Sequence, residues 1–338
     1  MLVIFGVVTI IFVLFNIIPS DPAKLMLGDR DNEKQLKIIN EKYHFDKPLF
    51  TQYIYYLNDL SPISILYEEN SSFEYFTLIS FDSFKIILKF PYLRQSFYQK
   101  NVNVSSLIIN ALPNTFLLAF TSIFFGFIVG VPLGLLSAYY KGTYIDKFIT
   151  TISVLGMSLP SFFSAVLIAY IFAYRMKDFT GLDITGSLFV LNDLGTETYI
   201  NLKNLILPTL TLSIRPLAVI VNLTRASIIE QMSFDYILLA RSKGLSKMYV
   251  LICHALPNSM SSVVTATSGW FAGLLSGAVF VEYIFGWHGL GKLLVDGLVN
   301  MDFPLVMGII LVISSCFVLI NILVDLVYIW LDPRVKIY

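Results

Sequence analysis

Between two long apolar runs, the chain reads DYILLARSKGL at residues 235–245 and HALPN at residues 254–258. Tyr236, Ala240 and Gly244 recur at intervals of four, so a helix would place them on one face. Two of these three residues are small, which would let another surface approach the backbone closely. The basic residues that point away from that face, and can pair with acidic groups or lipid headgroups, are Arg241 and Lys243.

This polar stretch, residues 231–258, predicts two helices joined by a tight turn. Gly244 suits the left-handed conformation that ends a helix. A second helix would begin near Lys247 and end near Leu256, because Pro257 disfavours helical geometry in the residue before it. The result would be a helix–turn–helix on the cytoplasmic side; an ordinary basic amphipathic loop at the membrane surface is the alternative interpretation.

The composition is that of an integral membrane protein. Of the 338 residues, 56% are hydrophobic and 14% are charged, and the mean hydropathy is +0.75, whereas a soluble domain carries about 25% charged residues. The formal net charge is zero, so no global field attracts nucleic acid. Cys253 and Cys316 lie far apart and the three histidines are dispersed, so neither a structural disulfide nor a metal site is expected.

Uncharged runs predict an all-α membrane protein with six transmembrane helices, since a helix needs about 20 apolar residues to cross the hydrocarbon. The predicted helices cover residues 1–19 and about 115–139, 148–174, 205–229, 259–281 and 303–330, and the fourth of them is interrupted by Arg215 and Arg225. The first run is longer than the apolar part of a secretory signal and no small-residue cleavage site follows it. An uncleaved first helix is therefore expected.

Lysine and arginine in the short loops predict that both termini are cytoplasmic. In that orientation seven basic residues lie inside: Lys141, Lys147, Arg241, Lys243, Lys247, Arg334 and Lys336. Four lie in the short outer loops: Arg175, Lys177, Lys203 and Lys292. Residues 20–104 would then form a small external domain, and residues 105–338 the membrane core.

The external segment is rich in aromatic residues, which favours a folded domain over a disordered linker. Residues 31–43 and 48–60 are predicted to be helical, the second with Pro48 at its start. Residues 86–88, Ile-Ile-Leu, are consistent with a strand or with a buried turn.

Several short motifs resemble those of inner-membrane permeases of dipeptide, oligopeptide and nickel ABC importers. In the polar stretch and the helix before it they are LTLSI (210–214), TRAS (224–227), Tyr236 to Gly244 and HALPN (254–258). The others follow in family order: IPSDPA (18–23), FDKPL (45–49), Gln52-Tyr53, ALPNT (111–115, the entry to helix two), GWHGLG (286–291), DLVY (325–328) and LDPR (331–334). The resemblance covers nearly the whole chain, and the ordered set is specific although each piece is short.

The resemblance implies a coupling loop seated in a cleft of a cytoplasmic ATPase subunit. The residues expected at that cleft are Tyr236, Ala240, Gly244 and Leu245, with Arg241 and Lys243 beside them. Leu256 and Pro257 would brace the second helix. Two partner ATPase domains would bind ATP and Mg²⁺, and this chain would bind no cofactor. A second homologous permease, an external solute-binding protein and membrane lipid complete the expected partners, in the bacterial inner membrane.

The sequence departs from the family pattern at three places. Leu238-Leu239-Ala240 stands where the broad importer pattern has Glu-Ala-Ala, a loss that is common in the peptide branch. His288 occupies a position that is usually proline. Residues 61–91 resemble an insertion in the external domain, which would change either how a binding protein docks or whether one is used.

Three further sites have two interpretations each. Arg215, followed by the helix-loosening Pro216, is either a pathway cation for a substrate carboxylate or a side chain that snorkels to the outer interface. Glu282 either contacts the binding protein or marks the interface. The small residues of span five would form either a pathway wall or permease interface, or ordinary helix packing; they are Gly269, Gly273 and Gly277.

The segment GWHGLGKL at residues 286–293 nearly matches a phosphate-binding loop. Such a loop needs Ser or Thr after the lysine to hold Mg²⁺, and Leu293 cannot do so. The glycines are expected instead to let an external loop pack between helices five and six.

The predicted function is a permease subunit of an ATP-driven importer, with no catalytic residues on this chain. Di- or oligopeptides are the expected cargo, and nickel complexes and other small solutes stay open. A secondary transporter would usually show repeat symmetry and paired intramembrane charges, and neither is visible in the sequence. A receptor or scaffold would not need the Ala–Gly–Leu-Pro loop.

Overall fold

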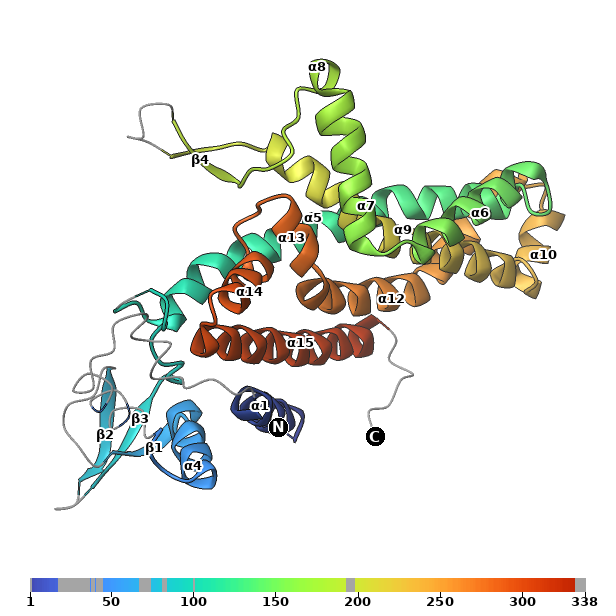
Figure 1. Cartoon of the computed structure of the whole chain (residues 1–338). Coiled ribbons are helices and arrows are strands. Elements are labelled where there is room, and N and C mark those ends of the chain that lie inside the picture. The colour runs from blue at the N-terminus through green and yellow to red at the C-terminus, as the bar shows by residue number, and fades with distance from the viewer. Residues whose placement is uncertain are drawn as a thin grey trace. The chain divides into compact units, whose positions relative to one another are not determined.

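The computed structural model describes residues 2–17, 37, 40, 45–66, 74–80, 84–99, 101–192 and 198–331; the surroundings of residues 16, 17, 191, 276, 277 and 327–331 are not described. The chain forms two compact units, residues 1–110 with 294–314 and residues 111–293 with 315–338 (Figure 1). The helix predicted for residues 31–43 falls almost entirely outside the described residues.

The first unit combines helices with a small antiparallel sheet. Its complete elements are α1 (Leu2–Ile17), α4 (Leu49–Leu60), β1 (Ile63–Leu66), β2 (Tyr75–Ser80) and β3 (Lys85–Lys89). The strand order is β1-β3-β2. The helix predicted for residues 48–60 is confirmed as α4, which begins directly after Pro48. β3 confirms that residues 86–88 form a strand.

The sheet corrects the prediction of an all-α protein. Its strands are rich in isoleucine, which suits a pleated, half-buried surface, and alternation puts Ser64 and Ile87 inside at 3% and 0% exposure. The outer edge of β1 is covered by Asn58 of α4. Its side-chain amide donates to the carbonyl of Ile65 and accepts from the N–H of Ile65, both at 3.0 Å. The edge strand is thereby protected from pairing with another chain.

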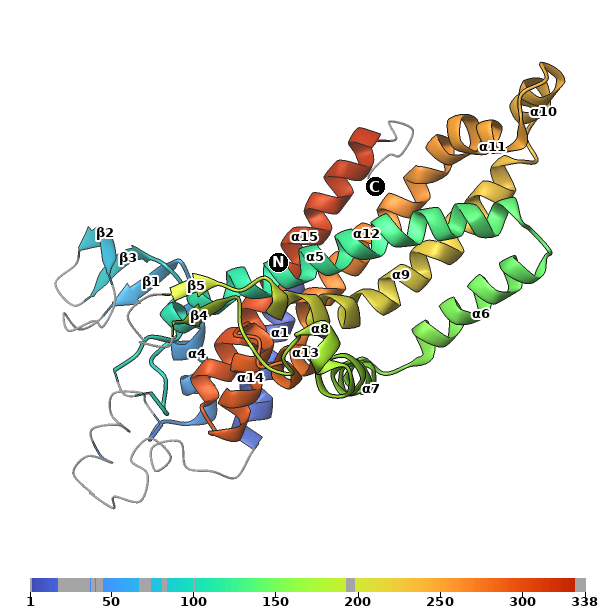
Figure 2. The ribbon, with the colours of Figure 1, turned by 90° about the horizontal axis from the view of Figure 1, so that it is seen from above.

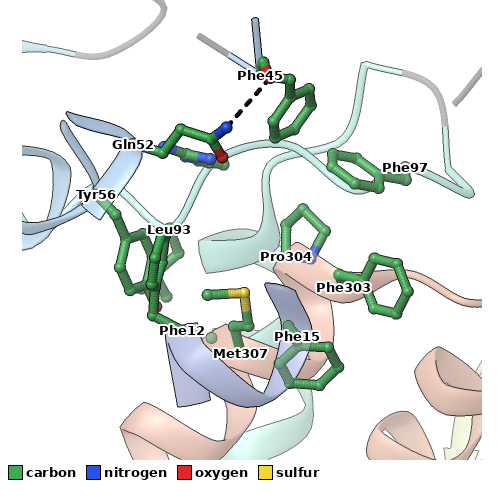
Figure 3. Close-up of a pocket in the computed structure, with 12 residues that line it drawn as sticks. Phe12, Phe15, Phe45, Gln52, Tyr56, Leu93, Phe97, Phe303, Pro304 and Met307 are labelled. Carbon is green, nitrogen blue, oxygen red and sulfur yellow. Dashed lines mark hydrogen bonds between the residues drawn. The ribbon is translucent and has the colours of Figure 1, made fainter. Parts of the chain in front are cut away.

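An aromatic cavity of about 60 Å³ lies inside this unit (Figure 3). Six of its lining residues carry aromatic rings: Phe12, Phe15, Phe45, Tyr56, Phe97 and Phe303. The polar groups at its wall are already bonded, since Gln52 donates to the Phe45 carbonyl at 3.1 Å and Arg94 pairs with Asp59 at 3.0 Å. The cavity is therefore lined mainly by apolar surface.

A buried acid begins the last helix, α15 (Phe303–Leu331). Asp302 is 1% exposed and accepts from the backbone N–H of Leu305 at 3.4 Å, in the manner of an N-cap. It also accepts from the backbone N–H of Phe97 at 3.0 Å and from the Ser96 hydroxyl. One carboxylate thus caps α15 and fixes the loop that forms part of the cavity wall.

The second unit is mainly helical. Its elements up to the fourth predicted span are α5 (Val104–Tyr139, from residue 111), α6 (Tyr144–Ser158), α7 (Ser161–Ile168), the π-helical segment η1 (Ala169–Arg175), α8 (Lys177–Thr180), β4 (Phe189–Leu191), β5 (Thr198–Ile200) and α9 (Lys203–Gln231). The later ones are α10 (Asp235–Ser242), α11 (Lys247–Val250), the π-helical segment η2 (Leu251–Ala255), α12 (Leu256–Gly277), α13 (Val279–Ile284), α14 (Leu290–Val299, to residue 293) and α15 (from residue 315). In both views, α10 and the β4–β5 hairpin lie at opposite ends of this unit (Figure 2).

Close packing of α5 on α9 forms the centre of this unit. Gly126, Gly130 and Gly134 repeat every four residues along α5, so they face one neighbour. A Cβ at Gly130 would lie 3.2 Å from the Leu217 carbonyl oxygen, and one at Gly134 would lie 2.7 Å from that of Val221. Only hydrogen atoms at these positions let the two backbones approach so closely.

The third predicted span is not one helix. α6 and the α7–η1 helix meet at an angle of 108° instead of forming a continuous span over residues 148–174. Pro160 has no N–H to donate and forces Leu159 into an extended conformation, with ψ of 132°, so the helix must end there. The second predicted helix is also longer than expected, because α5 begins at Val104 and contains ALPNT in its interior.

Among the described helices, α5, α9 and α15 are long and apolar enough to cross a membrane, and the bent α6–α7 pair would be a fourth. α1 is apolar but shorter. The remaining predicted span corresponds to α12, whose serine and threonine residues lower its hydropathy. A predominantly helical protein with several apolar spans is therefore observed.

Candidate functional site

The predicted helix–turn–helix is present at one end of the second unit, as α10 followed by α11 (Figure 2). Gly244, between them, has φ of +83°, which confirms the predicted left-handed turn. Apart from its two chain neighbours, no described residue has an atom within 4 Å of a Cβ built on Gly244, so glycine is needed for its backbone conformation and not for space. The Ser246 side chain then caps α11 by accepting from the N–H of Tyr249.

One face of α10 is buried. Ile237 is 1% exposed and Ala240 is 7% exposed. They pack in a hydrophobic cluster with residues of α5, α9, α11 and η2, namely Ala138, Ile228, Val250, Leu251 and Ala255. The expectation that Ala240 faces outward is therefore corrected: Ala240 lies three positions after Ile237, on the same inward face. Its small side chain is part of this hydrophobic cluster beneath α10, hereafter the seat of α10.

The opposite face of this segment exposes apolar side chains. Leu238 and Leu239 are 70% and 59% exposed, and Tyr236 and Leu245 also reach solvent. Seven exposed residues of α10 and its turn are hereafter called the α10 surface: Tyr236, Leu238, Leu239, Arg241, Lys243, Gly244 and Leu245. Apolar side chains gathered on a surface and flanked by polar ones are typical of a protein interaction site.

Three helices hold the segment in place through polar contacts. The Tyr236 hydroxyl donates to Gln231 of α9 at 2.7 Å and accepts from Asn258 of α12 at 3.1 Å. The Lys247 ammonium donates to the carbonyl of Tyr139 at the end of α5 and lies 4.5 Å from the centre of the Tyr139 ring. A cation at that carbonyl is favourable because the C-terminal end of a helix carries partial negative charge.

The second helix of the motif does not end near Leu256, which corrects another expectation. α11 continues through η2 directly into α12. Pro257 stands in the first turn of α12, where a missing N–H costs little, and the wider π-helical turn before it accommodates the ring. Leu256 packs against the cluster beneath α10, whereas Pro257 is exposed.

An ion pair between the half-buried Arg225 and the buried Asp146 joins α9 to α6. Arg225 donates to both carboxylate oxygens of Asp146, at 2.6 Å and 2.8 Å. Asp146, whose side chain is 4% exposed, also accepts from the Ser137 hydroxyl at 2.6 Å and the Gly142 N–H at 2.8 Å. These four residues are hereafter the clamp. From the sequence, Arg225 was noted as an interruption of the fourth span and as part of the TRAS motif, but its partner was not identified, although a charge in an apolar helix signals a partner elsewhere.

The glycine-rich loop before α14 holds a carboxylate of its own chain. Glu282 is 0% exposed, and its Oε2 accepts from the N–H groups of Gly291 and Lys292 at 2.7 Å and 3.3 Å. A Cβ at Gly289 would overlap that oxygen, and one at Gly291 would lie 3.0 Å from it. The loop therefore resembles a phosphate site at a helix N-terminus, with the Glu282 carboxylate in the place of phosphate. In this chain Glu282 is buried, not at the surface as expected.

Two candidate pathway positions are open in this chain. Arg215 is exposed halfway along α9, and the ion pairs among the described residues do not include it. A Cβ at Gly269 or Gly273 of α12 would meet no atom of another described element within 4 Å, so neither glycine packs tightly against another helix in the described part of the chain. The surroundings of Gly277 are outside the described part.

Within the described residues, no group of three or more His, Cys, Asp or Glu side chains could hold a metal ion. Cys253 and Cys316 are free. The described site is therefore an exposed surface on α10 that is held in place by a hydrophobic cluster and by side-chain hydrogen bonds.

Comparison with known proteins agrees with this arrangement over nearly the whole length. Residues 130–337 match the family described as binding-protein-dependent transport system inner membrane component, and residues 1–119 match the corresponding N-terminal family. The probable D,D-dipeptide transport system permease protein DdpB of Escherichia coli is 32% identical, over 99% of this chain and 94% of that protein. The dipeptide transport system permease protein DppB of Bacillus subtilis is 31% identical, over 98% and 93%.

Solved structures share the fold of part of the chain. A chain of the inward-facing MetNI methionine ABC transporter superposes with a TM-score of 0.55 at 17% identity, covering 68% of this chain and 97% of its own. A second crystal form of that transporter gives 0.53 at the same identity. Given the family matches and these relatives, the chain belongs to the binding-protein-dependent transport system inner membrane components and is a multi-pass inner-membrane permease subunit of an ABC importer.

Proposed function

We propose that this permease imports short peptides and that the α10 surface is where partner ATPases act on it. The observation that carries the proposal is the two-sided construction of α10. Its inner face is seated in a buried cluster, and its outer face exposes leucines at the end of the unit. A surface that is exposed but rigidly supported can receive force from a partner and pass it to the helices beneath. The names of the relatives support di- or oligopeptides as cargo.

Within this surface the residues have different roles. Leu238 and Leu239 supply the apolar contact, and Tyr236 contacts the ATPase while its hydroxyl fixes α9 to α12. Ala240 and Leu256 act from beneath, by filling the seat. The remaining contact residues are Arg241, Lys243, Gly244 and Leu245, and Pro257 supports the start of α12.

Six spans with both termini in the cytoplasm fit this role. The spans are α1, α5, the bent α6–α7 pair, α9, α12 and α15. The positions of α10 and the β4–β5 hairpin at opposite ends of the second unit support an inner and an outer side (Figure 2). Residues 20–104 are the external domain, and the sheet within residues 61–91 is the inserted part that meets an external binding protein.

A second, homologous permease completes the pathway. Gly269 and Gly273 leave an open stripe on α12 that another helix or the cargo can approach, and Gly277 continues the same spacing. Arg215 supplies a cation for the carboxylate of a peptide. Arg215→Gln is expected to lower dipeptide uptake without loss of assembly, and unchanged uptake would assign Arg215 to the membrane interface instead.

ATP and Mg²⁺ bind to the partner ATPase domains in this proposal, and this chain supplies no catalytic group. The test is affinity purification of the chain, in mild detergent, from cells that also produce its partner ATPases. Leu238→Asp and Gly244→Asp are expected to lose the co-purifying ATPase that the wild-type chain retains.

Gly181→Asp is the matched control. Gly181 also has a left-handed backbone, with φ of +62°, and only the Lys203 ammonium lies within 4 Å of a Cβ built on it, at 3.9 Å. Gly181 ends α8, away from α10. The Gly181→Asp variant should therefore co-purify as much ATPase as the wild-type chain does. Recovery of the wild-type chain with no ATPase would favour a secondary transporter or a receptor and would refute the coupling role.

A further inference from the structure

We propose that the clamp makes α6 move as one body with the ATPase-contacting segment, so that Asp146 and Arg225 are positioning residues for transport. The inference rests on the proposed function, because it concerns how motion of α10 reaches the pathway. Two observations support it: the ion pair and hydrogen bonds of Asp146, and the position of the clamp residues next to the cluster beneath α10.

The clamp is continuous with the seat of α10. Ser137 of the clamp is followed directly by Ala138, which lies in the cluster beneath α10. Arg225 lies one helical turn before Ile228, which is in the same cluster. α5 and α9 therefore each contribute one residue to the clamp and, within a turn, one to the seat. Asp146 is the residue through which α6 joins them.

The geometry of the clamp fixes the orientation of the Asp146 carboxylate relative to the Arg225 guanidinium, as well as the distance between them. A bidentate arginine–carboxylate pair holds the two groups in one plane, unlike a contact between two aliphatic side chains. The Ser137 hydroxyl and the Gly142 N–H occupy the remaining acceptor sites of the carboxylate, so Asp146 is held from three segments. The first turn of α6 cannot rotate against α9 without breaking several of these bonds together.

Movement of α6 has a consequence further along the chain. α6 ends at the break around Leu159 and Pro160, and α7 starts at a bend of 108°. Near the other end of α6, a Cβ at Gly156 would lie 3.1 Å from the Ile214 side chain of α9. α6 is thus fixed to α9 at both ends, by charge near α10 and by close packing near the bend, and it can transmit a displacement to α7.

Spin-label distances in the complete importer test this directly. The complex is placed in lipid nanodiscs with native Cys253 of η2 and an introduced Leu155→Cys on α6 labelled, and with Cys316→Ser. Cys253 and Leu155 are both exposed. Distances are compared between the nucleotide-free state and the state trapped with ATP and vanadate. Wild type should give one narrow distance that is the same in both states.

The variant Asp146→Asn with Arg225→Gln removes both charges, so neither partner is left buried and unpaired. Its distance distribution should broaden and shift on trapping. The uptake of radiolabelled alanyl-phenylalanine per ATP hydrolysed should fall roughly tenfold, with ATPase co-purifying as in wild type. Arg225→Lys, which keeps a cation beside Asp146 and leaves its bonds with Ser137 and Gly142 in place, should broaden the distribution less than the charge-free variant does. Asp183→Asn, which breaks the exposed pair of Asp183 with Lys177, is the matched control and should behave as wild type.

A wild-type distance that changes on trapping would overturn the proposal, even if both clamp variants fail to fold. So would a charge-free variant that keeps the wild-type distance and the wild-type uptake per ATP, since the pair would then only stabilise the fold. Absence of ATPase from every sample, wild type included, would instead refute the coupling function on which the inference depends.

Discussion

Asp146 and Glu282 are both acids buried in the second unit, at 3% and 0% exposure, but they are stabilised by different means. Asp146 lies against an arginine and accepts from a hydroxyl and a backbone N–H. Glu282 forms no ion pair among the described residues and is held by the Thr115 hydroxyl and by backbone N–H groups at the start of α14. Its Oε1 has no hydrogen-bond partner in that part of the chain.

The two sites show two ways in which a carboxylate can be stabilised when it is buried: by an opposite charge, or by close approach of the backbone. The clamp depends on opposite charge, and its arginine side chain supplies donors on a long stem that can adjust. The site of Glu282 depends on space, because two glycines must have no side chain if the backbone is to approach one oxygen. The first site should therefore be sensitive to loss of charge, and the second to added volume.

The largest effect is expected from removal of one charge of the clamp. Arg225→Gln leaves Asp146 buried without its cation and should lower the stability of the folded chain by about 4 kcal/mol. The measurement is thermal unfolding of the purified chain in detergent, followed by size-exclusion chromatography. Asp183→Asn at the exposed pair is the control, for which less than about 1 kcal/mol is expected. Equal stability of the two variants would show that charge pairing is not what holds Asp146.

The next effect tests the importance of volume at the other site. Gly291→Ala would place a Cβ 2.5 Å from the Val279 Cα, a backbone atom that cannot move aside easily. A loss of about 2 kcal/mol is expected from such overpacking. Gly269→Ala, in a helix with open space around it, should be neutral or stabilising because alanine favours helices. If both alanines are tolerated alike, the close approach around Glu282 is not required.

The sequence was a reliable guide where the cause of a structure is local. Gly244 ends a helix because its own backbone requires positive φ, and α4 begins after Pro48 because proline fixes the entry to a helix. Long apolar runs with few charges likewise predicted α5, α9 and α15. Each of these signals acts within a few residues, so no knowledge of the tertiary fold was needed.

Two prolines show where such local rules stop. Pro160 breaks an apolar run, and Pro257 does not, although both follow residues of good helical potential. The difference is that Pro257 enters the first turn of α12 after a π-helical segment, whereas Leu159 before Pro160 is extended. Whether a proline breaks a helix or is absorbed depends on the preceding turn and its tertiary contacts, which the sequence alone does not define.

The candidate site was predicted in outline, with errors that arise from packing. The stretch 235–258 forms the predicted helix–turn–helix, but Ala240 lies on the buried face of α10, because helical spacing does not say which face a neighbour covers. Asp146 and Arg225 are 79 residues apart, and Thr115 and Leu290 are 175 apart. Contacts of this kind follow only from the fold.

A smaller effect is expected when both charges of the clamp are removed together. Asp146→Asn with Arg225→Gln leaves no buried, unpaired charge, and an amide pair can keep part of the hydrogen bonding. The loss of stability should be about 2 kcal/mol, smaller than for Arg225→Gln alone, because most of the single-variant cost is the stranded charge. A double-mutant cycle of thermal stability measures this. Strict additivity of the two single losses would show that the groups do not interact.

The smallest effect is expected at Glu282. In Glu282→Gln the amide oxygen can accept from the Gly291 and Lys292 N–H groups, and the amide nitrogen can occupy the place of Oε1, which accepts no hydrogen bond among the described residues. The volume is unchanged, so the glycines still fit. Stability should change by less than about 1 kcal/mol, the net value of one ordinary hydrogen bond. Glu282→Ala is the companion variant, since it leaves a cavity and two buried N–H groups without an acceptor, and it should cost clearly more. If Glu282→Gln instead destabilises the chain as much as Arg225→Gln, the negative charge of Glu282 matters as strongly as that of Asp146, and the distinction between a site held by charge and a site held by space fails.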